Sequence, residues 1–156
     1  MGPNPTDRAK GGVKRSVLCD GSGIPLGVAI DGANTHDIKL FLDTLLSVPI
    51  DWPDATAEAP QHMCLDAAYD ATWLKQQLLD WDLVPHVVSR GAEKKAKRKN
   101  PNKKARRWVV ERLHSWLNRF RRILVRWEKK VQNFQAMLHF AFSLILFRSA
   151  RLSQCG

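Results

Sequence analysis

One stretch near the middle of the chain, residues 103–130, restricts the possible folds most, because large apolar side chains recur in it every three or four positions. These residues are Val109, Leu113, Trp116, Phe120, Leu124 and Trp127. With about 3.6 residues per turn they form one stripe, which predicts a single amphipathic helix that buries the stripe. A polar line about half a turn away holds Lys104, Arg107, Glu111, His114 and Asn118. The pattern therefore predicts that Glu111 faces away from the core, where it can pair with Arg107.

The positive charge of the chain is concentrated around this helix. The formal net charge is +10, yet residues 90–130 alone contain seventeen Lys or Arg and three Glu. A field of this kind attracts polyanions, and nucleic acid is the usual one. A solubilising basic loop is the alternative for residues 89–103, a linker bounded by Gly and Pro.

Composition predicts one apolar core and a single domain over the 156 residues. Cys19, Cys64 and Cys155 are too far apart in sequence to indicate a disulfide framework or a zinc site, so a reducing cytoplasm is expected. Residues 1–12 are rich in turn formers, and we expect a loop without a secretory signal there. The apolar run at 137–147 is too short to span a bilayer.

The first half of the chain carries a hairpin signal. Residues 13–19 and 24–30 alternate between apolar and polar side chains, and the sequence DGSG between them has turn chemistry. A short helix with Thr35 as its N-cap is expected over 36–46.

The next segment indicates a strand, a helix and a strand, at 62–66, 71–81 and 84–88, with Trp81 on the buried side of the helix. This order implies parallel strands joined by a crossover. We therefore expect an α/β fold with a mixed sheet and flanking helices. Two long C-terminal helices should complete it, over 104–128 and over 131–151. The second should bury Phe134, Leu138, Phe142 and Ile145, and its nearly all-apolar surface predicts cover from the sheet and from another subunit.

Two acids are candidates for chemistry. Asp66 ends a predicted strand, and Glu111 lies on the long helix. Carboxylates brought together in this way are the hard oxygen ligands that Mg²⁺ prefers, and bound metal ions can activate water for phosphodiester cleavage. An Asp at a strand end is also a common turn cap, so both interpretations stay open.

Four phrases in the chain resemble one known family. They are GPNPTDRAK at 2–10, DGANTHD at 31–37, LDAAYD at 65–70 and RRWVVERLHSWLNRFRR at 106–122. Together they are similar to the catalytic region of bacterial insertion-sequence transposases of the DDE type, in the insertion-sequence-five-like group. The resemblance implies a ribonuclease-H-like fold and metal-dependent cleavage and strand transfer at transposon ends, with Mg²⁺ or Mn²⁺ as the cofactor.

The resemblance also assigns residues. Asp66 matches the second acid of the family and Glu111 the third. The helix signature is matched at Arg107 and Glu111, but Lys104 stands where Tyr is expected and Asn118 where Lys is expected. The strand with the first acid would precede the GPNPTDR phrase, so we expect an N-terminally truncated catalytic domain that binds Mg²⁺ poorly and does not cleave DNA alone.

The expected function is therefore DNA transposition, with double-stranded transposon ends as the partner in the bacterial cytoplasm and nucleoid. Residues expected to contact DNA are Arg90, Lys94, Lys95, Lys97, Arg98, Lys99, Lys103, Lys104, Arg107, His114, Asn118, Arg119, Arg121, Arg122 and Arg126. One alternative is a non-catalytic DNA-binding or dimerising remnant that modulates a full-length transposase through mixed oligomers. Another is a decayed product that barely folds.

Several further residues have both a structural and a functional interpretation. His36 and Asp37 match a family pair, but they can simply begin a helix. Tyr69 and Asp70 can orient the turn after Asp66. Three tryptophans could stack on bases, although aromatic residues at helical spacing usually belong to the core. They are Trp108, Trp116 and Trp127.

Overall fold

The computed structural model describes residues 2–4, 8, 11–56, 58–87 and 108–154. The chain forms two compact units, and each is described by itself. Unit 1 combines the two ends of the chain, Met1–Pro49 and Val109–Gly156, and unit 2 is Ile50–Trp108. The basic linker expected at 89–103 and residues 104–107 lie outside the described residues.

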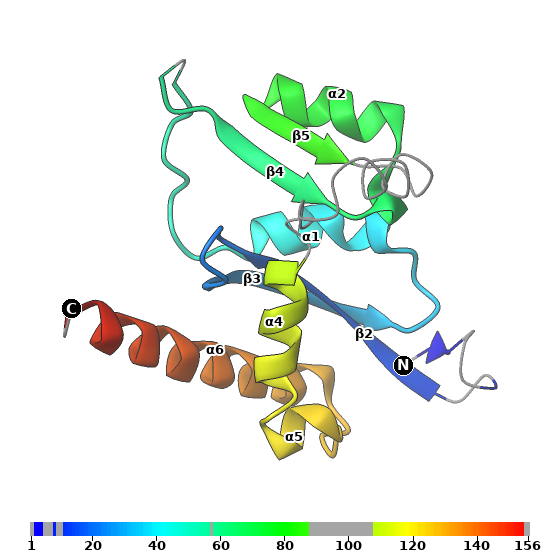
Figure 1. Cartoon of the computed structure of the whole chain (residues 1–156). Coiled ribbons are helices and arrows are strands. Elements are labelled where there is room, and N and C mark those ends of the chain that lie inside the picture. Colours follow the sequence, from blue (N-terminus) through cyan, green and yellow to red (C-terminus); the bar gives the residue numbers. More distant parts are fainter. Residues whose placement is uncertain (1, 5–7, 9–10, 57, 88–107, 155–156) are drawn as a thin grey trace, which may run out of the picture. The chain divides into compact units, whose positions relative to one another are not determined.

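Unit 1 contains a three-stranded sheet in the order β1-β2-β3 (Figure 1). The strands are β1 Gly2–Pro3, β2 Gly11–Cys19 and β3 Pro25–Gly32. The antiparallel pairing of β2 with β3 confirms the predicted hairpin, and the Asp20 carboxylate closes its turn by accepting the N–H groups of Ser22 and Ile24. The loop expected over residues 1–12 is wrong at Gly2–Pro3, which pairs with Gly11 and Gly12.

One face of this sheet carries η1 Asp37–Leu40 and α1 Phe41–Leu46. The buried hydroxyl of Thr44 in α1 donates to the Leu40 carbonyl at 2.6 Å and is hydrogen-bonded to the Ser16 hydroxyl of β2 at 2.7 Å, and the Ser47 hydroxyl accepts the N–H of Val28 at 2.8 Å. The helical segment begins where the sequence predicts, but Thr35 does not cap it. The Thr35 hydroxyl donates to Asp31, while the His36 ring accepts the N–H of Ile38 and caps η1.

The predicted long helix over 104–128 is wrong in its described part. It is divided into α4 Trp108–Leu117 and α5 Arg121–Leu124, and Phe120 between them has an extended backbone (φ −82°, ψ 106°). The break alters which residues face the core. Ile123 is buried in place of Leu124, and neither Leu124 nor Trp127 belongs to the buried stripe.

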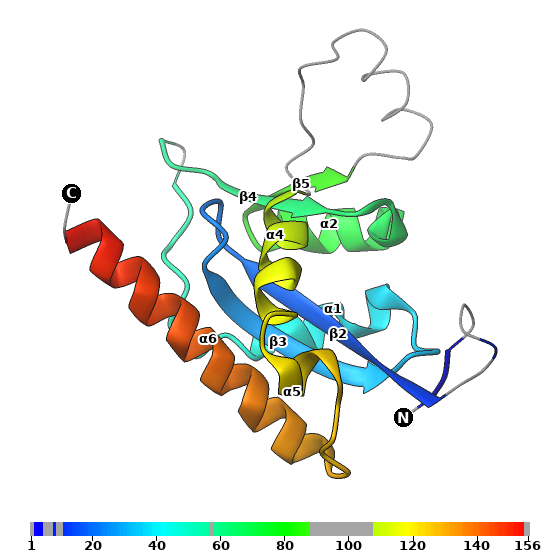
Figure 2. The same ribbon diagram turned by 60° about the horizontal axis from the view of Figure 1, so that its bottom comes forward.

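The last helix, α6 Val131–Gln154, is the one long helix in the described C-terminal part (Figure 2). Its predicted stripe of Phe134, Leu138, Phe142 and Ile145 is confirmed as buried. These side chains form the core of unit 1 together with β3 and with α4, which contributes Leu113 and Leu117. On the other side of α6, Phe140 and Phe147 are exposed in the single chain, and their cover by another subunit stays a prediction.

Unit 2 contains β4 Gln61–Leu65, η2 Ala67–Tyr69, α2 Thr72–Asp80 and β5 Leu83–Val87. The strands pair in parallel, as the predicted crossover requires. Leu74 and Leu78 of α2 are buried, whereas Trp81 is exposed, contrary to the prediction, because the helix ends before it.

The described strands form one antiparallel sheet in unit 1 and one parallel sheet in unit 2, and the joining of these strands into the single mixed sheet expected from the sequence stays a prediction. Sequence patterns give the pairing of neighbouring strands but carry no signal for the joining of separate sheets. In the described part of the chain, no helix is both long enough and apolar enough to cross a membrane.

Candidate functional site

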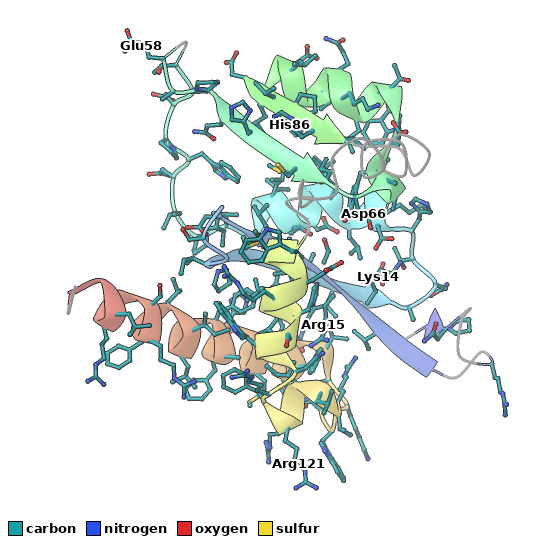
Figure 3. The ribbon with its side chains drawn as sticks, in the orientation of Figure 1. Lys14, Arg15, Glu58, Asp66, His86 and Arg121 are labelled. Carbon is teal, nitrogen blue, oxygen red and sulfur yellow. The ribbon has the colours of Figure 1, made fainter. Side chains whose placement is uncertain are left out.

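Asp66 lies directly after β4, at the carboxyl end of the strand, as predicted. Its side chain is exposed, and Oδ1 accepts the N–H of Ala67 at 2.6 Å, so the residue caps η2 (Figure 3). The Asp66 carbonyl accepts the N–H of Tyr69 at 2.9 Å. Asp70 follows at the end of this turn and pairs with Lys75 of α2. The Ala67 N–H thus holds one oxygen of the Asp66 carboxylate, and the orienting role expected for Tyr69 and Asp70 stays a prediction.

Glu111 lies in the first turn of α4, with its side chain exposed on the polar side of the helix. The opposite side buries Val109, Leu113 and Leu117, so the predicted orientation of Glu111 is confirmed. Asp66 belongs to unit 2 and Glu111 to unit 1. Among the described residues, no group of three or more His, Cys, Asp or Glu side chains could hold a metal ion.

The polar line of α4 is only partly exposed, because it meets a cation from the sheet. Arg15 of β2 donates from Nη2 to Oδ1 of Asn118 at 3.1 Å (Figure 3). His114, one turn before Asn118, is half-buried, and its expected contact with DNA stays a prediction. Burial lowers the pKa of Arg15 below its ordinary value. Burial also lowers the pKa of His114, and the charge of Arg15 lowers it further.

Sequence reasoning missed Arg15, although the alternation of β2 contains the signal. Val13 and Val17 pack against the core of unit 1, and Arg15 lies between them on the same side of the strand. A cation on an apolar face requires a polar partner from the element that covers it. Asn118 supplies that partner.

These shifts predict a pH dependence of stability. Because the pKa of His114 is lower in the folded chain than its ordinary 6.5, the unfolded chain takes up this proton first as the pH falls. The contribution of neutral His114 to the free energy of unfolding is fully present above pH 6.5. It is lost as the pH falls through the pKa that His114 has in the folded chain. Urea denaturation at pH 7.5 and pH 5 should therefore show a larger loss of stability for the wild type than for His114→Gln.

Exposed His139 of α6 provides the matched control, since His139→Gln should retain the pH dependence of the wild type. Equal pH dependence in the wild type and in His114→Gln would show that His114 does not carry this effect.

The Lys and Arg residues expected to bind DNA fall into three groups. Arg119, Arg121 and Arg122 lie in and just before α5 and are exposed, and their contact with DNA stays a prediction. Arg126 is instead half-buried against Phe134, with its guanidinium carbon 5.1 Å from the ring centroid. The remaining basic residues lie outside the described residues, namely Arg90, Lys94, Lys95, Lys97, Arg98, Lys99, Lys103, Lys104 and Arg107.

Comparison with known proteins gives two matches. Residues 2–146 match the family model described as "Transposase DDE domain". The chain is also 32% identical over 152 residues to a putative transposase for insertion sequence element IS402 from Burkholderia cepacia, with 96% of this chain and 70% of the relative covered. No solved structure matches.

Proposed function

Because the chain belongs to the transposase DDE domain family and acts in DNA transposition, we propose that Asp66 and Glu111 supply carboxylate ligands for the divalent metal ion of this family. The observation that carries the proposal is the family match over residues 2–146, which includes both acids. When bound, such an ion activates water and stabilises the leaving oxygen in phosphodiester cleavage.

The local geometry of each acid supports this role. Asp66 is exposed at a strand end, and the Ala67 N–H holds one of its carboxylate oxygens in place. Glu111 is exposed on a helix whose opposite side is fixed in the core. Carboxylate oxygens are hard ligands that suit Mg²⁺, and Mn²⁺ is an alternative with similar ligand preferences.

Binding of Mn²⁺, followed by electron paramagnetic resonance, tests the proposal directly on the purified chain. Asp66→Asn and Glu111→Gln should each weaken Mn²⁺ binding by about tenfold or more, because each removes a charged ligand. If both residues bind the same ion, the double variant should lose less than the product of the two single losses. Asp80→Asn is the control, since Asp80 is an exposed acid at the end of α2.

Two results would contradict the metal assignment. Unchanged Mn²⁺ affinity in both single variants would remove the acids from the metal site. If the loss of Mn²⁺ affinity in the double variant equalled the product of the two single losses, the two carboxylates would not share one ion.

The proposed DNA partner is the duplex at the transposon ends. The exposed guanidinium groups of Arg119, Arg121 and Arg122 support it, as does the charge concentrated in residues 90–130. Neutralised phosphates release counterions, so the affinity for duplex DNA should fall steeply as salt is raised. With DNA as the proposed partner, the proposed location of the protein is the bacterial nucleoid, in the cytoplasm.

A ribonuclease-H-like fold is the finer structural part of the proposal. It is supported by the order of an antiparallel hairpin, β2 and β3, followed by the parallel pair β4 and β5 with α2 between them. An experimental structure that joins these strands differently would overturn it.

The exposed apolar face of α6 favours a second candidate, a dimerising role. Phe140 and Phe147 lie one above the other on this helix at a spacing of seven residues, and both are exposed. Such a face is suited to a second copy of the chain or to a full-length transposase. Sedimentation of the purified chain tests this role, and a monomer at all concentrations would exclude self-association.

A further inference from the structure

Trp127 lies in the segment between α5 and α6, where it is 74% exposed. The spacing of apolar residues predicted a buried side chain at this position. A single exposed apolar side chain is common on protein surfaces, whereas several exposed apolar side chains close together favour contact with a partner. Leu124 and Val125, three and two positions before Trp127, are also exposed, so this short segment presents three apolar side chains to solvent.

The segment around Trp127 is held by its neighbours. Arg126 packs against the buried ring of Phe134, and its Nε donates to the Glu128 carbonyl at 2.8 Å. The Glu128 carboxylate, with only 11% of its side chain exposed, lies 3.6 Å from Nη1 of Arg122. Two inward-facing anchors therefore flank Trp127, and the indole between them projects into solvent.

The charges around this indole select the kind of partner. The nearby exposed cations in the chain are Arg119, Arg121, Arg122, Lys129 and Lys130, and the side chain of the nearest acid, Glu128, is largely covered. Figure 3 shows Arg121 at the outer side of α5. Two copies of this patch would repel each other, whereas a nucleic acid would neutralise it.

A nucleic acid offers a flat indole only one kind of apolar partner, the face of a base. Inside a duplex both faces of each base are covered by their neighbours, so the accessible face belongs to an unpaired base. Bases stack on aromatic side chains while surrounding cations hold the backbone phosphates. The exposed indole and the exposed cations that precede and follow it in the sequence match both requirements.

We propose that Trp127 is a stacking platform for an unpaired base in the bound DNA, with the flanking Arg and Lys side chains on the adjacent phosphates. The inference rests on the proposed DNA-binding function and adds the feature of DNA that is recognised. The exposed segment after α5 should therefore prefer DNA in which one base has left the base stack of the double helix.

The test compares two probes that bind the whole chain: a fully paired duplex, and the same duplex with one extra unpaired nucleotide. The wild type should bind the second probe more tightly, and Trp127→Ala should lose about tenfold in affinity for it. Trp127→Phe, which keeps an aromatic face, should retain most of the preference. Trp73→Ala is the matched control, because Trp73 is another exposed indole, in α2.

The outcomes separate this inference from the DNA-binding proposal. Equal affinity of the wild type for both probes, or an unchanged preference in Trp127→Ala, would overturn base stacking and leave duplex binding in place. An equal loss for both probes in Trp127→Ala would also overturn it, since Trp127 would then contact the duplex itself. Absence of any affinity in the wild type would overturn both proposals.

Discussion

Leu113→Ala is expected to lower the free energy of unfolding by about 3–5 kcal/mol. Leu113 is 0% exposed and lies in the core of unit 1 with Leu117 of the same helix and Leu138 of α6. Removing its side chain deletes buried methyl groups and leaves a cavity between elements that cannot fully close around it. Urea denaturation followed by circular dichroism measures the loss.

Leu124→Ala provides the matched control, because the sequence pattern places both residues on the same apolar stripe. Leu124 is 59% exposed after the break between α4 and α5, so its truncation should change stability by less than about 0.5 kcal/mol. Similar large losses for both variants would mean that one continuous helix buries the whole stripe. Because Leu113→Ala can remove much of the stability of a small domain, Leu113→Val provides a milder variant with the same expected order.

The contrast between these two leucines shows where sequence reasoning about the helix ends. The helical spacing of the apolar stripe continues across the segment Asn118, Arg119 and Phe120, and no Gly or Pro in this segment marks a break. The break occurs at Phe120, and Ile123 then packs into the core against α6. That packing depends on an element which begins eight residues further along the chain, and local periodicity does not contain it.

The local elements were predictable because their signals are short-range. Alternating side chains around the DGSG turn predict the hairpin of β2 and β3, and the crossover spacing predicts the parallel pair of β4 and β5. The burial of Phe134 and Leu138 also follows from helical spacing alone. Each of these signals lies within one element or one connection, and this is the range over which sequence patterns are informative.

The candidate site was predictable only in its parts. The position of Asp66 after β4 and the outward orientation of Glu111 both follow from local patterns. Arg15 was missed because its partner, Asn118, lies 103 residues away in sequence. The assignment of the two acids to one metal ion is a proposal that comes from the family, since they belong to different compact units.

Gly27→Ala is expected to destabilise the chain by about 2–3 kcal/mol, although alanine has the lower conformational entropy when unfolded. A Cβ at this position of β3 would lie 2.7 Å from the Thr44 carbonyl oxygen and 2.7 Å from the Ser47 hydroxyl. The carbonyl belongs to the backbone of α1 and cannot rotate away. The Ser47 hydroxyl, which accepts the Val28 N–H, would also be displaced.

Gly21→Ala separates this steric effect from the general consequence of replacing glycine. Apart from Gly21 itself and its chain neighbours, no residue has an atom within 4 Å of a Cβ built at this position, so the substitution should be neutral or stabilising by about 0.4 kcal/mol. Urea denaturation of the two variants should therefore give shifts of opposite sign or of very different size. If both variants were as stable as the wild type, α1 would not pack closely on β3 at Gly27. The close approach of this helix to the sheet, with its buried hydrogen bond between Thr44 and Ser16, would then have to be revised.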